Sequence, residues 1–127
     1  MQTFGDSMEP MRYSVFSVQD HYPWKERTVP ELYQQVVAQA ELAEELGYDT
    51  FYVAEHHFHE YGVIPNPPVM LGHLAHRTRR IRLGSAISVL TFHNPLSNAE
   101  QYAMAELIMN TLSSEPGDAR SAREVLE

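Results

Sequence analysis

Cysteine is absent from this chain of 127 residues. Its absence excludes disulfides, cysteine-based zinc sites, iron–sulfur clusters and catalysis by a thiolate. Long apolar runs are missing too, because no stretch approaches the roughly 18–20 residues that span a bilayer. The first residues include Asp6 and Glu9 and show neither a cationic start nor an apolar core, so we expect no secretory signal. Together these features predict a globular domain in the cytoplasm.

Cationic side chains are scarce relative to acidic ones. Nine Lys and Arg residues stand against 17 Asp and Glu residues, a formal net charge of −8 with the seven His counted as neutral. Because phosphate backbones and anionic lipid surfaces attract basic patches, we expect no nucleic-acid partner and no membrane partner. The glycine-rich phosphate loops and the Gly-x-Ser-x-Gly nucleophile turn are also absent.

Apolar patterning predicts strands and helices in alternation. Three segments rich in β-branched and aromatic residues predict strands, at 12–18, 50–54 and 81–90. Each is followed by a segment with helical apolar spacing, at 28–46, 66–80 and 94–110. The strand centres lie about 35 residues apart, the length of one βαβ unit. We therefore predict an α/β fold of about three βα units with parallel strands and right-handed crossovers.

Capping residues mark the ends of the predicted helices. Thr28 and Glu31 have the spacing of a capping box, and Gly47 stands where a left-handed C-cap is expected. Asn66 and Asn94, each followed by proline, predict the starts of the second and third helices. The positions predicted to face the core on the third helix are Leu96, Ala99, Tyr102, Ala103, Leu107 and Ile108.

A dense set of ionisable side chains directly follows the second predicted strand: Glu55, His56, His57, His59 and Glu60. In parallel sheets the carboxyl ends of the strands face the ligand crevice, so this set is the first candidate for a site. Three interpretations stay open: a metal site, loop histidines that are solvated or paired with carboxylates, and a histidine acting as general acid or base beside a ligand. The spacing matches no established short metal signature, so we assign no metal ligands.

The third predicted strand carries small residues between Gly84 and Val89. Small side chains at the mouth of a parallel sheet let a flat ring lie against the backbone. Small residues also fill the interior of a tapering barrel, and composition alone favours this second interpretation.

Five segments carry a likeness to a known family: Glu55–Gly62, Pro65–Pro67, His76–Gly84, His93–Pro95 and Ala99–Glu100. With their order and spacing, the stretch from Met11 to Met104 resembles the N-terminal part of the bacterial-luciferase-like, flavin-dependent monooxygenases. The resemblance implies the first part of a (β/α)8 TIM barrel. It also implies reduced FMN or a deazaflavin as the cofactor, oxygen as co-substrate, and an aldehyde or another small organic molecule as the substrate.

The same resemblance implies roles for individual residues. His56 corresponds to the family's active-site histidine after the second strand, which makes it the predicted catalytic residue. Ala86 and Ile87 fall where the family has a non-prolyl cis peptide under the flavin ring. Together with Glu55, which is placed to orient its neighbours by hydrogen bonding, they are the predicted cofactor-binding residues.

The chain also departs from the family. Members continue after the third helix with a Gly-Arg-containing turn and a fourth strand, which the residues from Ile108 to Gly117 do not resemble. A closed barrel takes roughly 250 residues, and about three of its eight βα units are present here. We therefore divide the chain into a disordered leader (1–10), the barrel part (11–110) and a polar, loosely docked tail (111–127).

Two function hypotheses follow from the resemblance to the family and from the absence of the family's later segments. The first is a flavin-dependent monooxygenase or reductase, truncated, that binds FMN weakly because the later phosphate-binding loops are missing. The second is a non-catalytic barrel module that has lost its flavin chemistry. In either case an open three-stranded sheet exposes strand edges and apolar surface, so we expect a homo-oligomer, most simply a dimer.

Overall fold

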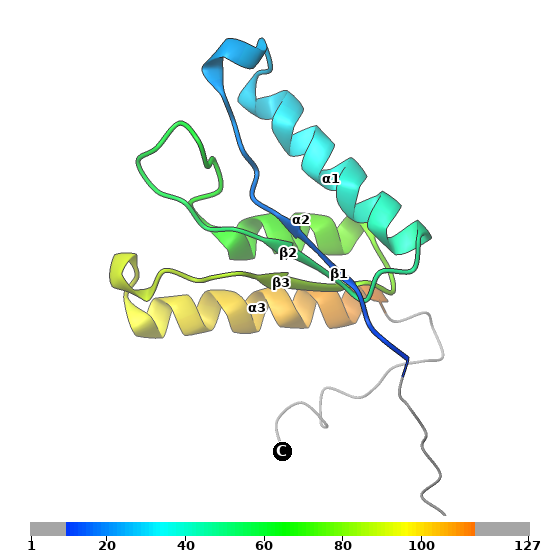
Figure 1. Ribbon diagram of the computed structural model, residues 1–127. Helices are drawn as coiled ribbons and strands as arrows, with labels where there is room; N and C mark the ends of the chain where they lie inside the picture. The colour runs from blue at the N-terminus through cyan, green and yellow to red at the C-terminus, as the bar shows by residue number, and fades with distance from the viewer. Residues whose placement is uncertain (1–9, 114–127) are drawn as a thin grey trace, which may run out of the picture.

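The computed structural model describes residues 10–113 and arranges them as a parallel sheet with helices packed against it (Figure 1). The strands lie in the order β1-β2-β3, and their bounds are Ser14–Ser17, Thr50–Val53 and Arg82–Ser85. The helices α1, α2 and α3 span Val29–Glu45, Pro67–Arg77 and Pro95–Ser113. Two 3-10 helices lie between them, η1 at Pro23–Lys25 and η2 at Leu90–Phe92. The predicted α/β order of three βα units with parallel strands is confirmed.

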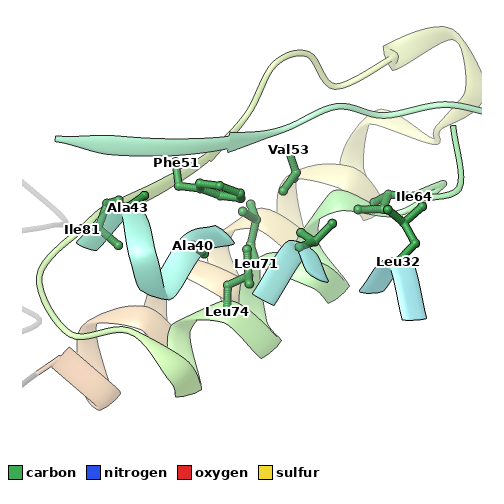
Figure 2. Close-up of a cluster of buried hydrophobic side chains, with 10 residues drawn as sticks. Leu32, Ala40, Ala43, Phe51, Val53, Ile64, Leu71, Leu74 and Ile81 are labelled. Carbon is green, nitrogen blue, oxygen red and sulfur yellow. The ribbon is translucent and has the colours of Figure 1, made fainter. Parts of the chain in front are cut away.

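The hydrophobic core lies between one face of the sheet and the helices α1 and α2 (Figure 2). Phe51 and Val53 point into it from β2 and are fully buried. Because side chains alternate across a strand, Tyr52 and Phe16 lie on the opposite face, where Phe16 is 53% exposed. The helices contribute the buried side chains Leu32, Val36, Ala40, Ala43, Leu71 and Leu74.

The parallel register aligns the carboxyl ends of all three strands. Ser17 pairs with Val53, and Val53 pairs with Ser85, so the strands end at the same level. The alignment continues beyond the strands, because the Ala86 amide donates to the Val53 carbonyl at 2.9 Å. The segments that follow the strands therefore begin side by side at one edge of the sheet.

Local signals place the helix ends where the sequence predicts them. The Thr28 side chain accepts from the Glu31 amide while the Glu31 carboxylate accepts from the Thr28 amide, which confirms the capping box. Gly47 has a φ of 78°, which confirms the left-handed position after α1. The side-chain oxygens of Asn66 and Asn94 accept amides in the first turns of α2 and α3, so both predicted starts are confirmed.

The predicted extents of three elements are wrong, and the second helix ends at Arg77 rather than at residue 80. The predicted strand 81–90 is limited to Arg82–Ser85, because β2, its hydrogen-bonding neighbour, ends opposite Ser85. The third helix runs to Ser113, past the predicted boundary at residue 110. Residues 1–9 and 114–127, which hold most of the predicted leader and tail, lie outside the described residues. No helix within 10–113 is long and apolar enough to cross a membrane.

The predicted core face of α3 is confirmed at Tyr102 but is wrong at Leu96 and Leu107. Among the residues of α3 whose burial is described, Asn98 and Ala105 are buried, and Tyr102 packs against the core from the same side. Leu96 and Leu107, predicted to be buried, are 71% and 56% exposed. The helix is apolar on more than one side, and within the described residues it packs mainly against α2, so a further apolar side is left uncovered.

Candidate active site

The backbone after β1 and β2 is held by a buried amide side chain. Gln19 is 2% exposed, and its side chain donates to the Ser17 carbonyl and accepts from the Ala54 amide at 3.0 Å. A buried amide group without such partners would cost free energy, so these bonds fix Gln19 between the two strand ends. They hold the backbone at the position directly before Glu55.

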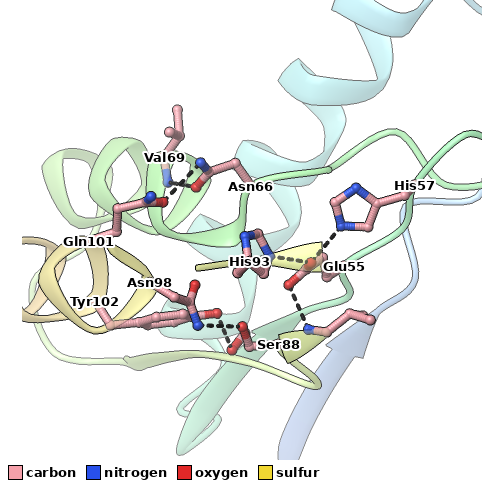
Figure 3. Close-up of polar contacts among 11 residues, drawn as sticks. Glu55, His57, Asn66, Val69, Ser88, His93, Asn98, Gln101 and Tyr102 are labelled. Atoms are coloured by element: carbon pink, nitrogen blue, oxygen red, sulfur yellow. Dashed lines mark hydrogen bonds and ion pairs between the residues drawn. The ribbon is translucent and has the colours of Figure 1, made fainter. Parts of the chain in front are cut away.

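Glu55 lies at the centre of a network drawn from the ends of β2 and β3 (Figure 3). Its side chain is 0% exposed. Its Oε1 atom lies 2.6 Å from Nε2 of His57 and 2.6 Å from Nε2 of His93. Its Oε2 atom accepts the Val89 amide at 2.9 Å. Glu55 therefore joins its own loop to the segment that follows β3.

The surroundings of Glu55 favour its ionised form. Burial raises the pKa of the Glu55 carboxyl, but the hydrogen bonds from His57, the Val89 amide and His93 lower this pKa by more. The net pKa lies below the ordinary glutamate value, so the group is a carboxylate near neutral pH. Charge-assisted hydrogen bonds of this kind are shorter and stronger than neutral ones, and they hold both imidazoles in fixed orientations.

His56, the predicted catalytic residue, has a different environment. Its ring packs against Gly62, where an added Cβ atom would lie 2.2 Å from ring atoms. Tyr61 meets the same ring edge-on, with 5.6 Å between centroids. Nε2 of His56 is buried and has no hydrogen-bond partner among the described residues. An unpaired buried nitrogen costs free energy, which a ligand group within hydrogen-bonding reach would recover.

The segment after β3 presents an exposed apolar residue. The peptide bond between Ala86 and Ile87 is cis, as the resemblance implies, and Ile87 is 69% exposed. Within β3, an added Cβ at Gly84 would lie 2.9 Å from the Tyr52 ring. The flat ring that lies against this strand at Gly84 is therefore the protein's own tyrosine, whereas Ile87 remains open to a ligand.

Helix α3 supports this segment through hydroxyl groups. The Tyr102 hydroxyl donates to Oγ of Ser85 at 2.8 Å, and the Asn98 amide donates to Oγ of Ser88 at 3.2 Å (Figure 3). These two contacts lie on either side of the cis peptide bond. They explain why the buried side of α3 is polar at Asn98, a feature that apolar periodicity does not reveal.

All the predicted site residues lie at one edge of the sheet, His56 after β2 and Ala86 and Ile87 after β3. Glu55 connects to the second of these segments through Val89. The catalytic and cofactor-binding roles of these residues stay predictions.

Two further site residues were not predicted. His93 completes the Glu55 network, and its signal in the sequence was its place after the third strand. Gly62 packs against His56, and only the three-dimensional contact shows why a glycine is needed there.

A family model described as luciferase-like monooxygenase matches residues 11–110. The chain belongs to the luciferase-like monooxygenase family. The oxygenase component of the flavin-dependent trigonelline monooxygenase of Acinetobacter baylyi is 29% identical to this luciferase-like chain over 100 residues. That match covers 79% of the chain and 28% of the relative.

Solved structures agree with the fold of this luciferase-like chain. A monooxygenase of Streptomyces bottropensis superposes with a TM-score of 0.72 and 33% identity, covering 79% of this chain and 30% of that one. The oxygenating constituent of 3,6-diketocamphane monooxygenase of Pseudomonas putida, solved with FMN, gives a TM-score of 0.72 at 20% identity. That match covers 80% of this chain and 28% of the neighbour. The predicted partial TIM barrel is confirmed, and the chain spans less than a third of the length of each of these relatives.

Proposed function

We propose that this chain forms the flavin-facing part of a luciferase-like monooxygenase that acts with reduced FMN and oxygen on a small organic substrate. The observation that carries the proposal is the buried, unpartnered Nε2 of His56, on the strand end next to the Ala86–Ile87 segment. Family membership supports the reaction class. The site supports a proton-handling group and an exposed apolar contact on neighbouring strand ends, which together suit a flat, partly polar ring.

Each residue at this edge has a separate task in the proposal. His56 accepts or delivers a proton at Nε2, because imidazole exchanges protons readily near neutral pH. Ala86 and Ile87 support one face of the ring. Glu55 keeps their segment in place through the Val89 amide at 2.9 Å. A bound reduced flavin supplies the electrons for oxygen activation, and a deazaflavin would meet the same residues.

Anchoring of the flavin phosphate is the weak part of the site. In the segments that join each strand to the next α-helix, the cationic side chains of the described residues are Lys25 and Arg27. Arg27 already donates to Gln35 at 2.8 Å and to the Asp20 carbonyl. Among the described residues of these segments this leaves Lys25, whose ammonium lies 4.8 Å from the centroid of the Tyr22 ring, to form a charge-assisted hydrogen bond with a phosphate. With a single such cation we expect weak FMN binding and negligible turnover from this chain alone.

Titration of FMN and of a deazaflavin into the wild type, His56→Ala and His73→Ala tests the proposal. His73 is an exposed histidine on α2, so it serves as the matched control. We expect weak binding that favours one of the two flavins and changes little in either variant. With the protein in excess so that reduced FMN is bound, a single reoxidation by oxygen, followed by flavin absorbance, should slow by about 10²-fold or more in His56→Ala alone, the usual contribution of a general acid or base.

Two outcomes would contradict the proposal in different ways. Submicromolar FMN binding by this chain would overturn the argument that the phosphate lacks an anchor. If flavin binds and reoxidation is the same in the wild type and His56→Ala, His56 is not the catalytic residue.

A non-catalytic module is the second candidate function. The match covers 28% of the trigonelline monooxygenase component, so most of a barrel is not represented in it. In that case the purified protein is colourless and binds neither flavin at any concentration tested, while its helical and strand content is retained. A yellow protein would contradict this candidate.

A further inference from the structure

The Glu55 network places three metal-ligating atoms together. One carboxylate oxygen of Glu55 and one ring nitrogen each of His57 and His93 lie within 4.8 Å of one another. The two histidines come from different strand ends, since His93 lies 38 positions after Glu55. Local spacing around Glu55 therefore matches no short metal signature, although the fold assembles a complete donor set.

The geometry of this set suits a cation placed between Oε1 of Glu55 and the Nε2 atoms of His57 and His93. Both Nε2 atoms are 2.6 Å from the same atom, Oε1 of Glu55. Zinc–nitrogen and zinc–oxygen bonds are about 2.0–2.2 Å long, which sets the ligand atoms around one ion roughly 3 Å or more apart. Small outward movements of the two imidazoles would therefore make room for an ion that replaces the protons of the two imidazole–carboxylate hydrogen bonds.

The three donor side chains are held in place by further contacts, as the ligands of protein-bound metal ions usually are. The Val89 amide fixes Oε2 of Glu55 at 2.9 Å, and metal-ligating carboxylates are themselves hydrogen-bonded in this way. The Phe92 ring packs 4.5 Å from the His57 ring, measured between centroids, and restricts its rotation. Each histidine side chain is 14% exposed while Glu55 is 0% exposed, so the set is partly open to solvent on the histidine side and closed on the carboxylate side.

We propose that Glu55, His57 and His93 form a site for a borderline divalent cation of the Zn²⁺ class. Two imidazole nitrogens and one carboxylate oxygen are a donor set found at zinc sites that keep a coordination position open. Ca²⁺ and Mg²⁺ are excluded as the preferred ions, because they take oxygen ligands almost entirely. The site is separate from the role proposed for His56, whose Nε2 is not among the ligand atoms.

Zinc titration of the untagged full chain tests this site. A chromophoric chelator competes for Zn²⁺ near neutral pH, and we expect the protein to withdraw one equivalent. His57→Ala and His93→Ala should each weaken that binding by at least about tenfold, the lower end of what even a supporting partner of a ligand contributes. His73→Ala is the matched control and should bind as the wild type does. Mg²⁺ in excess should not displace Zn²⁺.

Nitrogen-15 NMR of the wild-type histidine rings decides the question even if a variant does not fold. One equivalent of Zn²⁺ should shift the Nε2 signals of His57 and His93 and leave those of His73 in place. Circular dichroism shows whether each variant is folded, and the affinity of an unfolded variant is not compared with that of the wild type. Absence of binding at micromolar zinc, equal affinity in all three variants, or ring shifts at other histidines alone would each overturn the proposal. Loss of flavin binding would not bear on it.

Discussion

Gly62 is the residue on which the position of His56 most directly depends. A Cβ atom at residue 62 would lie 2.2 Å from the His56 ring, closer than any real contact. We therefore expect Gly62→Ala to displace the ring and to lower the free energy of unfolding by about 1–3 kcal/mol, the usual cost of forcing an extra carbon into a packed site. Urea denaturation measures the loss, and NMR shifts of the His56 ring report the displacement.

Gly72 provides the matched control for this substitution. It lies within α2, and no atom lies within 4 Å of a Cβ added there. Alanine is favoured over glycine inside a helix, so Gly72→Ala should raise the free energy of unfolding by about 0.5–1 kcal/mol. Equal destabilisation by the two substitutions, or an unmoved His56 ring in Gly62→Ala, would show that close packing at residue 62 does not position His56.

The sequence predicted part of this site and missed part of it. The place of His56 and of Ala86 and Ile87 follows from the rule that parallel strands present their carboxyl ends to ligands, together with the family resemblance. The partnership of Glu55 with His93 does not follow from either, because it joins residues 38 positions apart through a side-chain contact. Such contacts depend on rotamers and loop paths that periodicity does not encode.

At the scale of elements, Glu44 connects the end of α1 to the turn between α2 and β3. Its carboxylate accepts the backbone amides of Arg79, Arg80 and Ile81 at 2.8, 2.5 and 2.9 Å. An acidic side chain near the C-terminal end of a helix is unfavourable for the helix dipole. The three amide donors reverse that balance and anchor the turn that leads into β3.

Glu44→Gln should therefore destabilise the fold in a pH-dependent way. Burial raises the pKa of Glu44, but the amides of Arg80, Ile81 and Arg79 and the charge of Arg80 lower it by more, so it lies below its ordinary value of 4.5. A lowered folded-state pKa means that the stabilisation is complete above pH 4.5 and is lost as the pH falls through the folded-state pKa. We expect a loss of about 1–3 kcal/mol at neutral pH that shrinks in acid, measured by denaturation across pH.

Glu45→Gln is the control for that measurement, because Glu45 is exposed at the next position of the same helix. It should change the free energy of unfolding by less than about 0.5 kcal/mol. A loss in Glu44→Gln that does not change with pH would show that the ionised carboxylate is not the source of the stabilisation.

Capping signals were the most predictable part of the elements. Thr28, Asn66 and Gly47 act through hydrogen bonds or backbone angles within a few residues, so local sequence determines them. The burial of α3 was not predictable in this way. Its polar residue Asn98 faces inward to Ser88 while Leu96 faces outward, because the neighbouring elements, and not the helix itself, decide which side is covered.

At the scale of the whole molecule, apolar side chains are exposed along α3 and after β3. Met104 and Leu107 on α3 are 64% and 56% exposed, and Leu90 and Phe92 on η2 are 63% and 57% exposed. Met104 and Leu107 lie three positions apart on one helix and therefore share a face, and adjoining exposed apolar side chains of this kind mark interaction surfaces. We propose that a second copy of the chain covers them, which makes the protein a homodimer.

Light scattering at micromolar concentration checks the assembly. We expect twice the mass of one chain for the wild type and the mass of one chain for Met104→Glu or Leu107→Glu, because a charge in an apolar interface is costly to bury. Ala38→Glu, at an exposed position of α1, is the control and should leave the mass unchanged. A wild-type monomer would contradict the proposal.

The strand order β1-β2-β3 repeats the order of the strands in the chain. Each described strand therefore pairs with the one synthesised just before it, and none of the three waits for a partner encoded much later. A nascent chain leaving the ribosome can add one βα unit at a time to the same growing edge. Pairing between successive units keeps the separation of paired residues to one βα unit, 36 positions from Ser14 to Thr50 and 32 from Thr50 to Arg82, so each strand can pair as soon as its own unit is complete.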